Sequence, residues 1–247
     1  MRNIKLVIEY DGKDFNGWQK QPNKLNIQGE IERVISSITG EDDIELIASG
    51  RTDAGVHALG QVANFKTNSK IPIEKFSLAI NSRLKNSIVI KDAEEVNERF
   101  HSRYHCKKKT YRYIINNSKY GSAIYRNLEY HFPIKLNVDE MKRAAVFFEG
   151  EHDFKAFKAS GTSSKSSVRT IYKADVIKKD DRIYIELTGN GFLYNMVRII
   201  SGTLLEVGLG KIKPEDIVNI INEKNRERAG RTLPSQGLYL VEVNYDE

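Results

Sequence analysis

Strand-like and helix-like segments alternate along this chain in two similar blocks, and the pattern restarts near residue 106. Each block combines alternating apolar and polar runs, typical of half-buried strands, with segments whose apolar residues recur every three or four positions, typical of helices. This mixture predicts an α+β fold, in which helices pack on a largely antiparallel sheet. The 247 residues give room for two such blocks, and we predict subdomains of residues 1–106 and 107–247.

The first block is expected to contain two helices and several strands. The clearer helix covers residues 27–39, where Asn26 can cap the first turn and Gly40 can end the last one. Its apolar residues fall on one face, which predicts packing against a sheet. The remaining elements are expected at residues 72–84 for the second helix and at 5–10, 44–48, 61–66 and 87–93 for the strands.

The second block is expected to contain more helix. Residues 169–178 and 182–188 predict a hairpin, and residues 192–207 are long and apolar enough to form a buried helix. The serine-rich run at 161–167 predicts a flexible loop. The remaining elements are expected at 111–115 and 237–243 for strands and at 138–148 and 214–223 for helices.

Composition indicates a cytoplasmic protein. Lys and Arg number 39 against 33 Asp and Glu, a net charge of +6. The single cysteine, Cys106, cannot form an internal disulfide, which is typical of a reducing compartment. No apolar run approaches the ~18 residues that a membrane span requires, and no apolar stretch of signal-peptide length precedes Glu9. We therefore expect no membrane association.

The basic charge is concentrated in one stretch. Residues 99–128 contain eight Lys or Arg residues, six aromatic residues and no Asp or Glu. Cations neutralise phosphates and aromatic rings stack on unpaired bases, so this composition is typical of a surface that binds single-stranded or looped RNA. A solvated basic face with some core tyrosines has the same composition, and on charge alone both interpretations stay open.

Signatures of cofactor and metal chemistry are absent from the sequence. There is no phosphate-binding GxxxxGK[ST] loop, no complete GxGxxG and no GxSxG turn around a serine. His101, His105 and Cys106 are close in sequence, but no second pair of ligands follows them. We therefore predict no metal and no cofactor, so that any reaction would be performed by side chains alone.

The segment from Ser49 to Gly60 is the candidate for chemistry. It lies between two predicted strands and places one carboxylate, Asp53, two residues after Arg51. An arginine at this spacing can pair with the carboxylate and keep it ionised, and functional residues are common on loops held by strands. An ordinary polar turn is the alternative that the residues alone leave open.

The same segment carries a resemblance to a known family. Its run GRTDAGVHA at residues 50–58 resembles the signature of the TruA-type tRNA pseudouridine synthases, also described as tRNA pseudouridine(38–40) synthases. Further motifs resemble that family in the same order from residue 10 to residue 243, with Ser235 as one departure in the last motif. These are YDG with F, GWQ and Q at 10–21, NIQG at 26–29, FHSR at 100–103, KTYRY at 109–113, GEHDFKAF at 150–157, GFLYNMVR at 191–198, and Pro234 with GLYLV at 237–241.

The resemblance implies a reaction. Enzymes of this family isomerise uridine to pseudouridine at positions 38, 39 and 40 in the anticodon stem-loop of tRNA, without a cofactor. Asp53 matches their catalytic aspartate, and Tyr111, Arg51 and Arg198 match residues that hold the substrate or the aspartate. Whether the carboxylate attacks the base, attacks the ribose or removes a proton stays open. His57, Leu238, Lys109 and Arg103 match positions that are candidates for pocket or RNA contacts.

The resemblance also implies an architecture and an assembly. The family's pseudouridine synthase fold has two similar α/β-sandwich subdomains, a largely antiparallel sheet and a central active-site cleft. Its members are homodimers that bind the tRNA anticodon arm. This agrees with the two blocks that the periodicity predicts, whereas the homodimer is implied by the resemblance alone.

The sequence leaves three alternatives open. The first is an RNA-binding protein that has the fold without the reaction. The second is a metal-dependent nuclease that uses carboxylates such as Asp11, Asp14 and Asp53, although these are scattered over different segments. The third has the same chemistry on ribosomal RNA or on another tRNA position, since RNA is recognised largely by shape.

Overall fold

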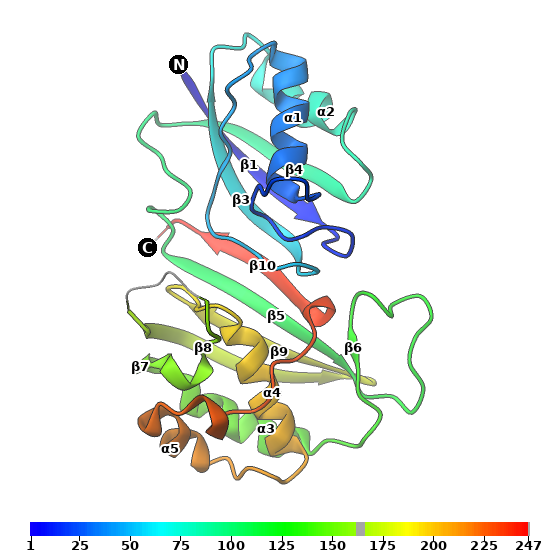
Figure 1. The fold of residues 1–247 in the computed structure, drawn as a ribbon, viewed down its shortest axis with the longest axis vertical. Helices are drawn as coiled ribbons and strands as arrows, with labels where there is room; N and C mark the ends of the chain where they lie inside the picture. The colour runs from blue at the N-terminus through cyan, green and yellow to red at the C-terminus, as the bar shows by residue number, and fades with distance from the viewer. Residues whose placement is uncertain (162–165, 247) are drawn as a thin grey trace. The chain divides into compact units, whose positions relative to one another are not determined.

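The computed structural model describes residues 1–161 and 166–246. They divide into two units, each containing strands and helices (Figure 1). Unit 1 contains residues 1–107 and 239–247, and unit 2 contains residues 108–238. Residues 162–165, within the loop that the sequence predicts at 161–167, lie outside the described part of the chain.

The strands of unit 1 pair mostly antiparallel. They follow the order β4-β1-β3-β10, and β2 pairs with β3 beside this path. β1 pairs antiparallel with both β3 and β4, and the alternating burial along β1 matches a strand with one face in the core. The bounds are Arg2–Tyr10 for β1, Ile47–Ala48 for β2, His57–Thr67 for β3, Ile88–Val96 for β4 and Leu238–Asn244 for β10. The strand that the sequence predicts at 44–48 is thus only two residues long.

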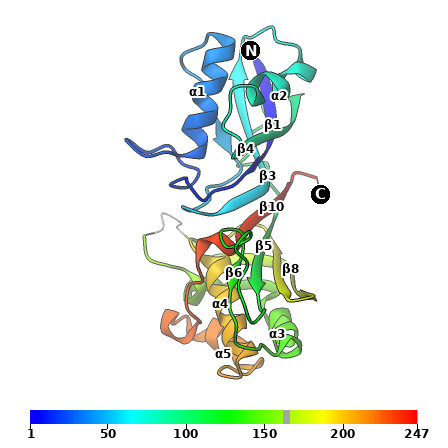
Figure 2. The same cartoon turned by 90° about the vertical axis from the view of Figure 1, so that its right-hand side faces the viewer.

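The helices of unit 1 are α1 (Ile27–Thr39) and α2 (Ile73–Asn81), which lie together in both views (Figures 1 and 2). The predicted boundaries of α1 are confirmed. The Gly29 N–H donates to Oδ1 of Asn26 at 2.8 Å, and Gly40 adopts the left-handed conformation after the last turn. α2 is shorter than the predicted 72–84, and it buries Phe76 and Ile80.

The strands of unit 2 follow the order β5-β9-β8-β7, and the short β6 pairs in parallel with β5. The predicted hairpin is confirmed, because β8 and β9 pair antiparallel across their connecting turn. The bounds are Lys108–Asn116 for β5, Tyr130–His131 for β6, Gly150–Asp153 for β7, Val168–Lys179 for β8 and Arg182–Gly189 for β9. With helices packed on mostly antiparallel strands in both units, the α+β class predicted from the sequence is confirmed.

The helices of unit 2 are α3 (Val138–Ala145), α4 (Met196–Gly208) and α5 (Asp216–Glu223). α3 packs on α4 and on β8, and α4 also contacts β5. The predicted helix at 138–148 ends as α-helix at Ala145 and continues as a 3₁₀ turn over Val146–Phe148. The predicted start of α4 at residue 192 is wrong, because Asn195 has a φ of 60° and an α-helix cannot pass through a left-handed residue.

From Tyr239 on, the last strand belongs to unit 1. In β10, Tyr239 pairs with His57 and Leu240 with Ala58 of β3, in parallel. Residues 239–247 therefore belong to a different unit from the one predicted by a single cut after residue 106. Within the described residues, no helix is both long enough and apolar enough to span a membrane.

Candidate active site

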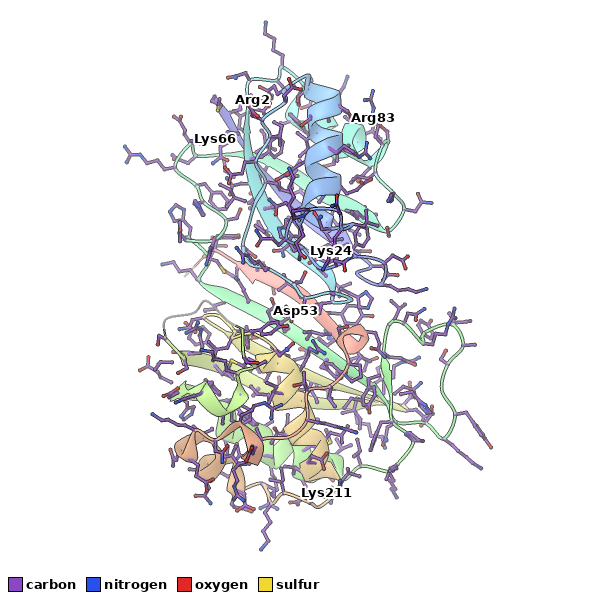
Figure 3. All side chains as sticks on the ribbon, in the orientation of Figure 1. Arg2, Lys24, Asp53, Lys66, Arg83 and Lys211 are labelled. Atoms are coloured by element: carbon purple, nitrogen blue, oxygen red, sulfur yellow. The ribbon has the colours of Figure 1, made fainter. Side chains whose placement is uncertain are left out.

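Asp53 lies in unit 1 on the segment that joins β2 to β3, and Figure 3 labels its position. Its side chain is half-buried, whereas that of Arg51 is exposed. The Asp53 carbonyl accepts a hydrogen bond from the N–H of Val56 at 3.1 Å, so the residue is part of a tight turn. The turn fixes the Asp53 backbone, and pairing of its carboxylate with Arg51 stays a prediction.

A second segment, residues 11–18, packs directly against this turn. The N–H of Trp18 donates to the Thr52 carbonyl at 3.1 Å, and the N–H of Gly55 donates to the Phe15 carbonyl at 3.4 Å. A Cβ added to Gly12 would lie 2.0 Å from the carbonyl oxygen of Val56, far inside van der Waals contact. Only glycine therefore allows the two segments to approach this closely.

Two buried polar side chains hold the residues just before Asp53. The hydroxyl of Tyr10, at the end of β1, lies 2.7 Å from the hydroxyl of Thr52. Gln61 of β3 accepts from the Ser49 hydroxyl at 2.7 Å and donates to the Gly50 carbonyl at 3.0 Å. Both side chains lie in the core of unit 1, so the N-terminal arm of the Asp53 segment is tied to two strands.

His57 follows the segment as the first residue of β3, with only 1% of its surface exposed. Its Nδ1 accepts from the N–H of Gly12 at 3.1 Å, and its ring stacks on Tyr239 with centroids 4.8 Å apart. Oδ1 of Asp11 also lies 3.1 Å from the same nitrogen. The structure thus places His57 as a buried support between the two segments.

Tyr111 lies in unit 2, in the middle of β5, where it pairs with Leu187 of β9. Its ring is half-buried and meets Phe192 edge-to-face, with centroids 5.1 Å apart. Lys109 lies two residues earlier on the same strand and is also half-buried. Residues two apart on a strand face the same side, so Tyr111 and Lys109 share one face of this sheet.

Arg198 lies in the first turn of α4, and neutral oxygen atoms accept from two of its nitrogens. Its Nε donates to the Leu233 carbonyl at 2.6 Å, and one terminal nitrogen donates to Oδ1 of Asn195 at 2.7 Å. Asn195 has a left-handed backbone, and its side chain makes no cap hydrogen bond to the helix. Its amide oxygen accepts from Arg198 instead. Carbonyl and amide oxygens therefore satisfy part of the Arg198 guanidinium.

The remaining predicted residues differ in exposure. Leu238 is buried at the start of β10, with 6% of its surface exposed. Arg103 is exposed, and its guanidinium lies 6.0 Å from the centre of the Tyr104 ring, which is itself 75% exposed. Arg103 and Tyr104 therefore belong to the solvent-facing part of the basic stretch at 99–128, where an RNA could reach them.

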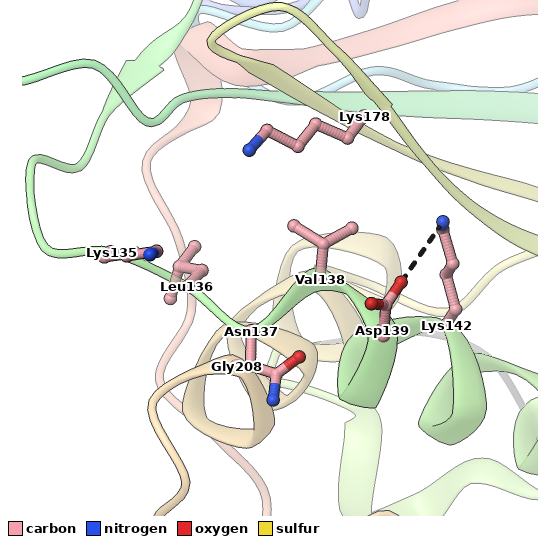
Figure 4. A pocket seen from close by; sticks show the side chains of 8 residues that line it. All are labelled: Lys135, Leu136, Asn137, Val138, Asp139, Lys142, Lys178 and Gly208. Atoms are coloured by element: carbon pink, nitrogen blue, oxygen red, sulfur yellow. Dashed lines mark hydrogen bonds and ion pairs between the residues drawn. The ribbon is translucent and has the colours of Figure 1, made fainter.

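The pocket drawn in Figure 4 lies in unit 2 and has a volume of about 510 Å³. Lys135, Lys142 and Lys178 line it, and Lys142 pairs with Asp139 at 3.5 Å. None of the site residues predicted from the sequence lines this pocket. In the described part of the chain, no three His, Cys, Asp or Glu side chains lie close enough together to hold a metal ion.

Sequence reasoning missed the supporting residues around Asp53. Tyr10 and Gly12 stand in the first motif, but their spacing of about 40 residues from the Asp53 segment gives no sign that they touch it. For Gln61, the sequence predicts only the start of a strand. A glutamine among the apolar residues of a predicted strand is the one signal that could have found it, because an amide that becomes buried needs hydrogen-bond partners.

Comparison with known proteins decides the family. A family model described as tRNA pseudouridine synthase matches residues 6–105 and 144–246. The chain belongs to the tRNA pseudouridine synthase family. It is 55% identical over 245 residues to tRNA pseudouridine synthase A of Acetivibrio thermocellus, covering 99% of this chain and 100% of that protein. It is 56% identical to the enzyme of the same name from Caldicellulosiruptor saccharolyticus, with the same coverage.

Membership in the tRNA pseudouridine synthase family confirms the resemblance that the motifs indicated. Enzymes of this family are isomerases, and membership implies isomerisation of uridine in tRNA. The α+β architecture with mostly antiparallel strands agrees with the pseudouridine synthase fold. The family thus fixes the reaction class.

Proposed function

We propose that the protein converts uridine to pseudouridine at positions 38, 39 and 40 in the anticodon stem-loop of tRNA, with Asp53 as the catalytic carboxylate. The observation that carries this proposal is the Asp53 segment itself. It bears the run GRTDAGVHA, and its backbone is held on one side by residues 11–18 and on the other by Tyr10 and Gln61. A carboxylate on a loop fixed in this way is preorganised for chemistry.

The reaction needs no oxidant and no energy donor. The C1′–N1 glycosidic bond breaks, the uracil turns over, and a C1′–C5 bond forms, while C5 loses a proton and N1 gains one. The product has the same atoms as the substrate. A carboxylate can attack the base, attack the ribose or accept the C5 proton, so Asp53 serves each route with the same oxygen atoms. We therefore propose a cofactor-free mechanism.

The supporting roles follow the family assignment. The target nucleotide must leave its stack before Asp53 can reach it, and a residue such as Arg51 can fill the vacated space. We assign Tyr111 to packing on the uracil, because its half-buried ring already makes an edge-to-face contact with Phe192. We assign Arg198 to the carboxylate and substrate, since Leu233 and Asn195 hold its guanidinium in one orientation.

The basic stretch supplies affinity in this proposal. The exposed Arg103 and the lysines around Lys109 contact phosphates of the anticodon arm, which positions the RNA without reading its sequence. Leu238 contributes to the pocket wall, and the buried His57 supports the Asp53 segment rather than touching the RNA. A cytoplasmic homodimer completes the proposal on the strength of the family alone.

The test is a direct assay of product. The purified protein is incubated in EDTA with an unmodified tRNA transcript that carries uridines at 38, 39 and 40, and pseudouridine is mapped at single-nucleotide resolution. Asp53→Asn should abolish product while tRNA affinity stays within a few-fold, because the amide neither attacks nor accepts a proton. Asp14→Asn is the matched control, since it removes an exposed carboxylate of the neighbouring segment.

The outcomes separate the alternatives. Pseudouridine at these positions, lost in Asp53→Asn and kept in Asp14→Asn, supports the proposal. Product that forms without EDTA but not in its presence contradicts the cofactor-free mechanism. Product at other uridines, or only in a ribosomal RNA panel, contradicts the assigned target. The assignment of the reaction itself would still hold. Loss of tRNA binding in Asp53→Asn would mean that the residue has a structural role.

A further inference from the structure

The residue before Asp53 is anchored by a pair of buried hydroxyl groups. Thr52 has 7% of its surface exposed and Tyr10 has 3%, and their hydroxyl oxygens lie 2.7 Å apart. Tyr10 is the last residue of β1, which pairs with β3 on one side and β4 on the other. Tyr10 is therefore fixed in the strands of unit 1. Through the hydroxyl pair it holds Thr52, whose backbone adjoins Asp53.

The same arm is held at two earlier positions. Gln61, with no exposed surface, accepts from the Ser49 hydroxyl and donates to the Gly50 carbonyl. The Thr52 carbonyl in turn accepts from the N–H of Trp18. Thr52 is thus held at its side chain by Tyr10 and at its carbonyl by Trp18. Of these two contacts, a conservative substitution of Thr52 removes only the one made by the hydroxyl group.

Uncharged groups make this anchor. Burial raises the pKa of the Tyr10 hydroxyl, against the opposing effect of hydrogen bonds with Thr52 and Gln61. The phenol therefore stays protonated across the working pH range, and a neutral phenol can both donate and accept. Its ring lies 6.0 Å from that of Trp18, so the aromatic part is packed independently of the hydroxyl.

We propose that the Tyr10–Thr52 hydroxyl pair is a positioning element of the active site, which sets the placement of the Asp53 carboxylate for the chemical step. Reacting groups must be held to within a fraction of an ångström, and a misplacement of about 1 Å can cost about 100-fold in rate. A hydroxyl pair one residue from the carboxylate controls that placement without entering the reaction. This inference rests on the proposed role of Asp53.

If Tyr10 only filled the core, removal of its hydroxyl would have a different effect. Such a residue would change stability when its hydroxyl is removed, and the rate per folded molecule would stay the same. A positioning residue lowers the rate of the chemical step and leaves tRNA affinity unchanged, because binding energy comes from other surfaces. Rate and affinity must therefore be measured separately, on protein shown to be folded.

The experiment is a double-mutant cycle read by single-turnover kinetics. Tyr10→Phe and Thr52→Val each remove one hydroxyl and keep the shape, and we expect each to lower the single-turnover rate about tenfold, with the tRNA Kd within about twofold. The double variant should fall by about the same tenfold, since the interaction is already lost in either single variant. Thr52→Ser keeps the hydroxyl and should stay within about twofold of the unaltered protein.

Tyr245→Phe is the matched control. Its hydroxyl is also in unit 1 and donates to the Ser102 carbonyl at 2.8 Å, and burial raises the pKa of this hydroxyl too. This variant should keep the full rate. An unchanged rate in Tyr10→Phe, an equal loss in Tyr245→Phe or a multiplicative loss of about 100-fold in the double variant would each overturn the proposal. If Tyr10→Phe does not fold, the contrast between Thr52→Val and Thr52→Ser decides the question by itself.

Failure of the proposed function gives a different pattern. If Asp53→Asn retains the rate, the assignment of the carboxylate is wrong, whatever the hydroxyl variants do. If Asp53→Asn is inactive and Tyr10→Phe and Thr52→Val are fully active, the assignment of the carboxylate holds and the positioning role is refuted. The two proposals can therefore fail independently.

Discussion

The two units hold their candidate functional side chains in different ways. In unit 1, Asp53 is on a loop whose backbone is hydrogen-bonded to residues 11–18 and whose approach to them depends on Gly12. In unit 2, Arg198 is on a helix, and its own side chain is held by Asn195 and the Leu233 carbonyl. A short carboxylate is placed by fixing its backbone, whereas a long guanidinium has to be fixed at its end.

This difference follows from side-chain entropy. Aspartate has two rotatable side-chain bonds, so its carboxylate lies close to a fixed main chain. Arginine loses about 2 kcal/mol of rotamer freedom when it is ordered, and two directed hydrogen bonds near the guanidinium offset that cost. Unit 1 is therefore expected to be sensitive to changes in backbone packing and unit 2 to the loss of particular acceptors.

The largest expected effect is at Gly12. Gly12→Ala places a Cβ 2.0 Å from the Val56 carbonyl oxygen and forces the Asp53 segment to move. We expect a fall of about 100-fold in single-turnover rate and about 1–3 kcal/mol in the free energy of unfolding. Chemical denaturation and rapid-quench assays on the same preparation measure the two quantities.

Gly202→Ala is the counterpart in unit 2. Its Cβ would lie 1.9 Å from the Arg231 carbonyl oxygen, so the stability loss should be similar. The rate should fall only about tenfold, because Arg198 keeps its contact with Asn195, the residue that precedes its helix, even if the segment that carries Leu233 moves. Equal rate losses in the two variants would refute the distinction between backbone and side-chain placement.

A smaller effect is expected at Asn195. Asn195→Gly retains the left-handed backbone and removes the acceptor for Arg198, so the single-turnover rate should fall about fivefold with little change in stability. Asn195→Ala should show the same fall in rate and should also lower the free energy of unfolding by about 1 kcal/mol, because alanine disfavours a positive φ. If glycine behaves as the original residue, the amide oxygen has no part in placing Arg198.

The smallest expected effects are on stability, at one carboxylate in each unit. A hydrogen bond from the Thr67 hydroxyl and one from the Asn68 N–H lower the pKa of Glu41, whereas Lys224, with help from Ser167, lowers the pKa of Asp153. In both cases the folded protein favours the ionised form. The stabilisation is therefore present near pH 7 and is lost as the pH falls through the lowered folded-state values.

Glu41→Gln and Asp153→Asn test this pair of carboxylates by urea unfolding. Each should cost about 0.5–1 kcal/mol near pH 7, and the difference from the unaltered protein should vanish in acid. At about 1 M salt the Asp153 effect should shrink, since its partner is the charged Lys224 at 2.8 Å, and the Glu41 effect should remain because its donors are neutral. A Glu41 effect that salt removes would contradict the assignment of uncharged donors.

Local signals allowed much of the fold to be predicted. The ends of α1 follow from a cap at Asn26 and a left-handed Gly40, and the β8–β9 hairpin follows from alternation on both sides of a polar turn. The predicted α4 began too early, since Phe192 and Leu193 continue its apolar pattern. The left-handed Asn195 that ends this continuation is coupled to a contact with Arg198, which periodicity does not record.

The sequence by itself determined the α+β class, the family and the candidate set around Asp53, because these depend on periodicity and on contiguous motifs. Only the tertiary structure decided that Tyr239 lies beside His57 and that Tyr10 meets Thr52. Both contacts join residues that are far apart along the chain. Their formation depends on how strands pair in the whole sheet, so no local pattern of residues specifies them.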